Sequence, residues 1–124
     1  MLEATMAMVL LGIAAAGVLL PFAHGATVQA DGFHRTLGAI LANELIERIV
    51  ATPFDQIVTT YNYSESQGQL KDASGTTLTD SMYANFSRQV DCVWDANQDF
   101  FIVATVRVYY LGQEVAAIHR LISE

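Results

Sequence analysis

The N-terminal part of the chain carries almost no charge, and this restricts its fold more than any other feature. Glu3 is the first ionised side chain and Asp31 is the next. Between them lies an apolar run, residues 4–22, which as a helix would be about 28 Å long. That length is close to the hydrocarbon thickness of a bilayer, about 30 Å. We therefore expect residues 1–30 to form a hydrophobic helix in a membrane or a filament core.

Four interpretations of this run compete. A secretory signal peptide would be cut in the small-residue stretch before Ala26, but the basic residues that precede such a run are missing. A plain single-pass anchor fits the length. A buried core helix that is apolar on every side needs partners on every side, and the other residues are too few to surround it. A helix that leaves the bilayer and packs among copies of itself is the fourth interpretation, and Glu3 favours it.

Glu3 needs a positive partner if it lies in apolar surroundings. The first basic residue is Arg35, too far along the chain, so the terminal ammonium of this chain or of a neighbour is the available cation. This predicts helices that stack with an axial offset. Gly12 and Gly17 would let such helices approach closely, and Pro21 would weaken the helical hydrogen bonds near its end. We expect these four residues to serve assembly.

Composition excludes several classes of protein. The chain has 124 residues, of which 52% are hydrophobic and 15% charged, so it forms one domain and is not disordered. A net charge of −7 opposes nucleic-acid binding. The single cysteine, Cys92, excludes an intrachain disulfide and a multi-cysteine metal site. His24, His34 and His119 lack metal-ligand spacing, and no nucleophile motif stands out. We therefore expect that the protein binds no metal or cofactor and is not an enzyme.

Residues 31–124 are expected to form a globular head. Apolar residues at three- and four-residue spacing predict an amphipathic helix over residues 31–52, which Pro53 ends. Glu44 and Arg48 form a favourable four-residue pair on the opposite side of this helix. The predicted apolar face consists of Phe33, Leu37, Ile40, Leu41, Leu45, Ile49 and Val50.

Residues 56–123 are expected to form an antiparallel sheet of three to four strands. A short strand is predicted at residues 57–63, and the polar stretch 64–81 is predicted to be an exposed loop. Residues 100–111 are the strongest strand, and a turn at Gly112–Gln113 leads into a hairpin. The predicted fold is α+β, with the long N-terminal hydrophobic helix as a stalk on the sheet. Alternation predicts another half-buried strand whose inward residues are Phe86, Arg88, Val90, Cys92 and Trp94.

Two short patterns fit the sequon for N-linked glycosylation. They begin at Asn62 and Asn85, each followed by an aromatic residue and a serine. So short a pattern recurs often by chance, so both are weak candidates for modification.

The stretch at residues 2–15, LEATMAMVLLGIAA, resembles the N-terminal methylation segment of type IV pilins and type II secretion pseudopilins. The resemblance places Glu3 on the family's glutamate, Gly12 on its helix glycine and Pro21 near its helix-interrupting proline. It implies N-terminal processing at Met1, although the family's glutamate is the fifth mature residue and here it is the third. Residues 41–49 are similar to the second half of the long helix in the type II secretion branch.

The resemblance implies a structural subunit of a type IV pilus-like extracellular filament. Its precursor would lie in the cytoplasmic membrane, in contact with lipid, until assembly machinery in that membrane extracts it. Copies would then polymerise through the N-terminal hydrophobic helix into a filament at the cell surface. One alternative is a minor pilin or type II secretion pseudopilin that primes a short periplasmic filament. Another is a membrane-anchored binding module.

Overall fold

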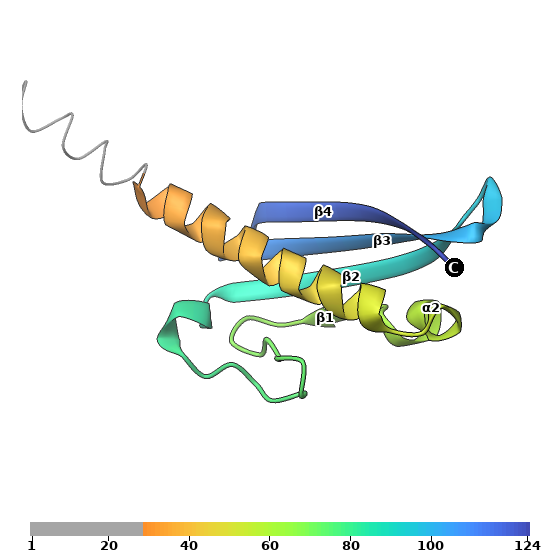
Figure 1. The fold of residues 1–124 in the computed structure, drawn as a ribbon. Helices are drawn as coiled ribbons and strands as arrows, with labels where there is room; N and C mark the ends of the chain where they lie inside the picture. The colour runs from red at the N-terminus through yellow and green to blue at the C-terminus, as the bar shows by residue number, and fades with distance from the viewer. Residues whose placement is uncertain (1–28) are drawn as a thin grey trace, which may run out of the picture. The chain divides into compact units, whose positions relative to one another are not determined.

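The computed structural model describes residues 29–124 of the chain, of which residues 34–124 form one compact unit. A helix over residues 29–51 is followed by an antiparallel sheet (Figure 1). The remaining elements are η1 (Phe54–Gln56), α2 (Ile57–Thr60), β1 (Tyr63–Glu65), η2 (Ser81–Tyr83), β2 (Phe86–Asp95), β3 (Gln98–Tyr110) and β4 (Gln113–Ser123).

The sheet follows chain order, β1-β2-β3-β4, and every neighbouring pair is antiparallel. Alternation along the strands puts one set of side chains on the helix side and the other set on the opposite face. In β2 the buried positions are Phe86, Arg88, Val90 and Cys92, whereas Trp94 is 47% exposed. The register between β2 and β3 shifts after Trp94. The ring of Trp94 packs edge to face against the ring of Phe54, with centroids 5.5 Å apart.

The helix over residues 29–51 packs one side on the sheet. Leu37, Leu41, Leu45 and Ile49 are buried at four-residue spacing, as the amphipathic pattern predicts. Three other predicted core residues are exposed instead: Phe33 is 54%, Ile40 58% and Val50 43% exposed. Ile40 and Val50 are exposed because residues on the other flank complete the buried stripe. The flank that completes the stripe consists of Gly38, Ala42 and Ile46.

Gly38 allows the helix to lie close to the edge of the sheet. A Cβ atom at this position would stand 2.7 Å from Cγ2 of Val115 on β4, a separation that two carbon atoms do not tolerate. Further along, the carbonyl of Leu41 reaches Arg88 on β2. The helix therefore crosses the sheet from β4 towards β2.

The expectation of a long hydrophobic stalk helix on the sheet is wrong. The helix that covers the sheet is the one over residues 29–51, and its exposed side carries charged residues such as Arg35 and Glu47. Within residues 29–124, no helix is long and apolar enough to cross a membrane. The apolar run at residues 4–22, on which the stalk was predicted, lies outside the described residues.

The strand predicted at residues 57–63 is wrong as well. Residues 57–60 form α2, and the first strand starts only at Tyr63. Ile57 is fully buried, and Val58 and Tyr61 pack against the same core, a spacing that suits a helical turn better than a strand.

The hairpin between β3 and β4 turns one residue earlier than predicted. Leu111 and Gly112 both have positive φ, 49° and 82°, as the right-handed twist of a tight two-residue hairpin requires. Glycine adopts this backbone freely, and Leu111 is held there by a hydrogen bond from its N–H to the carbonyl of Asn85.

Candidate functional site

Arg88 is the centre of the most unusual polar cluster in residues 29–124. It lies on the helix side of β2, and its side chain is fully buried between hydrophobic neighbours. A buried guanidinium is stable only if its charge and its five N–H donors are matched. The site is therefore defined by what surrounds this one side chain.

Two carboxylates and two backbone carbonyls surround Arg88. Its Nε donates to Oε1 of Glu65 on β1 at 2.7 Å, and its Nη1 donates to Oε2 of Glu44 on the long helix at 2.9 Å. Nη1 also donates to the carbonyl of Leu41 at 3.1 Å, and Nη2 to that of Lys71 at 2.9 Å. Burial lowers the pKa of Arg88, but the contacts with Glu65 and Glu44 outweigh this effect and raise its pKa overall.

Arg48 extends the cluster along the helix. Its Nη2 contacts Glu44 at 2.9 Å, which confirms the predicted four-residue pair. Its guanidinium also donates to the carbonyls of Lys71 and Asp72, at 3.0 and 3.1 Å. The Nε of Arg48 is buried and has no hydrogen-bond partner among the residues that the structure describes. Both arginines thus bind the backbone at residues 71–72.

These bonds fix the predicted loop over residues 64–81 to the rest of the unit. The second oxygen of Glu65 accepts from the N–H of Lys71 at 2.5 Å, and the neighbouring Leu70 is fully buried. Asp72 closes the turn that follows by accepting from Ser74 and Thr76, and these hydrogen bonds lower its pKa. The stretch is therefore anchored in the core, although its composition predicts only an exposed loop.

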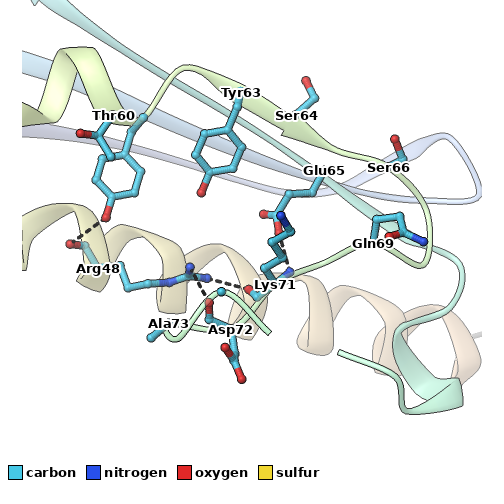
Figure 2. Close-up of a pocket in the computed structure, with 12 residues that line it drawn as sticks. Arg48, Thr60, Tyr63, Ser64, Glu65, Ser66, Gln69, Lys71, Asp72 and Ala73 are labelled. Carbon is cyan, nitrogen blue, oxygen red and sulfur yellow. Dashed lines mark hydrogen bonds between the residues drawn. The ribbon is translucent and has the colours of Figure 1, made fainter. Parts of the chain in front are cut away.

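A pocket of about 640 Å³ opens beside the cluster (Figure 2). Arg48, Tyr63, Glu65 and Lys71 line it, together with residues of the anchored loop. Burial, and next the nearby charge of Glu65, raise the pKa of the Tyr63 hydroxyl, so that group is neutral at physiological pH. The lining can therefore offer hydrogen bonds and both signs of charge to a polar group.

The residues predicted to serve assembly belong to the N-terminal segment. Glu3, Gly12, Gly17 and Pro21, and Met1 with them, lie outside the described residues. Their roles stay predictions.

The two sequon asparagines lie in residues 34–124. Asn62 binds the backbone of two elements, since its amide nitrogen donates to the carbonyls of Val58 and Cys92 and its oxygen accepts from the N–H of Cys92. Asn85 is exposed in the turn that directly precedes β2. The structure thus gives Asn62 a structural task, and glycosylation at either residue stays a prediction.

The cysteine and two of the histidines also lie in this part of the chain. Cys92 is buried, and burial raises the pKa of its thiol to about 11. The His34 ring stacks on that of Tyr110, with centroids 3.7 Å apart, and His119 shares a hydrogen bond with Thr105. No group of three or more histidine, cysteine or acidic residues within residues 29–124 is placed to hold a metal ion.

No family model, curated protein or solved structure matches this chain. The class of protein is therefore described by its fold and its polar cluster alone. Residues 34–124 are a helix-on-sheet unit in which a buried arginine joins the helix, two strands and a loop.

Proposed function

We propose that this protein is a structural subunit of a type IV pilus-like extracellular filament. The observation that carries the proposal is the N-terminal sequence, in which Glu3 precedes a long apolar run with no charge before Asp31. A lipid tail and a neighbouring leucine are about equally apolar, so hydrophobicity alone gives little discrimination between membrane and filament. A carboxylate that must meet a terminal ammonium supplies the register that apolar contacts lack.

The arrangement of residues 34–124 supports a subunit in which the N-terminal segment polymerises and the remaining residues form a separate head. Their core is formed by residues from the helix, α2 and all the longer strands of the same unit, and Phe54 of η1 packs against it. The cluster around Arg88 ties the loop to that core. Such a head is suited to stand outside the filament axis while the apolar segment makes the contacts between subunits.

The proposal predicts that Glu3→Ala abolishes filaments and leaves membrane insertion intact. A subunit without the carboxylate leaves the neighbour's ammonium unpaired, at a cost of roughly 3–5 kcal/mol. Electron microscopy of the sheared surface fraction and immunoblots of washed membranes measure the two outcomes in the native host. Glu47→Ala is the matched control, because Glu47 is exposed on the long helix. Normal filaments from the Glu3 variant would refute the proposal.

A pseudopilin that primes a short periplasmic filament is the second candidate. The segment at residues 41–49 favours it through its similarity to the type II secretion branch, and in this chain that segment supplies Glu44 and Arg48 to the buried cluster. Filament length separates the two candidates, since a major subunit forms long homopolymers and a pseudopilin does not.

A further inference from the structure

The two edges of the sheet are built differently. The β1 edge is three residues long, Glu65 points into the core from it, and the anchored loop continues directly from it. The β4 edge is eleven residues long, and the structure pairs it with β3 alone among residues 29–124. Short strands and inward-pointing charges are devices that keep a sheet edge from pairing with another chain. The β1 edge has both of these devices.

On the β4 edge such devices lie only near the two ends. Gln113–Ser123 contains no proline, and its charged residues are Glu114 at the start and Arg120, which pairs with Ala104 and lies on the helix-side face near the end. The irregularity in its pairing with β3 lies opposite Val108 and Tyr109, near the start of the strand. From Ala116 onward the pairing with β3 is regular, and the other backbone edge of the strand has no strand partner among residues 29–124.

Exposed apolar side chains accompany this row. The strand register aligns Val93, Val103 and Leu121 across three strands on the face away from the helix, and Leu121 is 56% exposed. On the helix side, Ile118 is only half-buried, whereas its partner Val106 on β3 is fully buried. A further strand beside β4 would cover apolar surface on both faces of the sheet.

We propose that β4 pairs antiparallel with β4 of a second copy of this chain and joins the two sheets into one. A twofold axis lets the same strand act as both partners, so one open edge suffices. The chain has a net charge of −7, which would oppose self-association, but β4 carries one acidic and one basic residue and adds no net charge to the contact. This pairing does not rest on the proposed filament, because it uses no residue of the N-terminal segment.

Two pairs of added lysines test the surface. Ala117→Lys with Leu121→Lys places like charges opposite one another along the paired strands, which is unfavourable. Gln89→Lys with Val93→Lys adds the same charge to the same face, on β2. Light scattering of the full chain in detergent should give a dimeric protein mass for the wild type and the β2 variant, and a monomeric mass for the β4 variant. A monomeric wild type, or equal loss in both variants, would overturn the proposal.

Engineered cysteines test the geometry. Ala117, Ile118, His119 and Arg120 are each replaced by cysteine in the full chain, and disulfide-linked dimers are measured after mild oxidation. Near a twofold axis one or two of these positions should give most of the dimer, and Glu47→Cys on the helix should give none. The native Cys92 adds no background, since it is buried and burial raises the pKa of its thiol to about 11.

The outcomes separate this inference from the proposed function. If the filament proposal and the β4 pairing are both correct, the Glu3→Ala variant forms no filaments but still forms the cysteine-linked dimer. Equal cross-linking at every position, or cross-linking of β4 to a different protein in place of its copy, would contradict the pairing.

Discussion

Replacing Arg88 by methionine is expected to lower the free energy of unfolding by about 3–5 kcal/mol. Methionine keeps much of the volume but leaves Glu65, which is 7% exposed, buried without its cation. The carbonyls of Leu41 and Lys71 lose their donors at the same time. Urea titration of the full chain in detergent, followed by the fluorescence of Trp94, its sole tryptophan, measures the change.

Arg107→Met is the matched control for this experiment. Arg107 contacts Glu114 at 3.5 Å, and both side chains are more than two-fifths exposed, at 42% and 48%. An exposed pair of this kind contributes about 1 kcal/mol or less. Equal losses in the two variants would show that burial of Arg88 has no special cost and would contradict the role assigned to it.

A double replacement separates charge from packing. Arg88→Met with Glu65→Leu removes both buried charges, and apolar replacements of a buried pair are often close to neutral. We therefore expect the double variant to be more stable than Arg88→Met alone. A double variant that loses the sum of both single effects would show that Arg88 and Glu65 act independently.

Leu45→Ala is expected to cost about 2–5 kcal/mol, because it leaves a cavity between the helix and the sheet. Leu45 is fully buried, whereas Ile40 on the same helix is 58% exposed. Ile40→Ala should therefore change the free energy of unfolding by about 0.5 kcal/mol or less. The same urea titration measures both variants. A larger loss for Ile40 than for Leu45 would mean that the helix turns a different side to the sheet.

These two helix residues also show how far the sequence pattern reaches. Spacing of apolar residues predicts that the helix is amphipathic, and it assigns Leu45 correctly. It assigns Ile40 to the core as well, because periodicity marks a broad side of the helix and leaves its rotation against the sheet undetermined. That rotation is set by the close approach of Gly38 to Val115, a contact between distant parts of the chain.

The polar cluster could be predicted only in part. Arg88 at an inward strand position and the Glu44–Arg48 spacing are visible in the sequence, and each forms a contact in the structure. Nothing in the sequence indicates that Glu65 is buried, because it lies in a stretch of serine and glutamine that is typical of solvent-exposed loops. Its burial depends on Arg88, which is 23 residues away, and local composition does not reveal such a partner.

The most direct test of the account is electron microscopy of wild-type chain sheared from cells of the native host. We expect long filaments built from this chain alone, in which the carboxylate of Glu3 lies within ion-pair distance of a neighbour's terminal ammonium. Chain recovered only as separate detergent-bound particles, or filaments in which Glu3 faces water with no cation nearby, would contradict it.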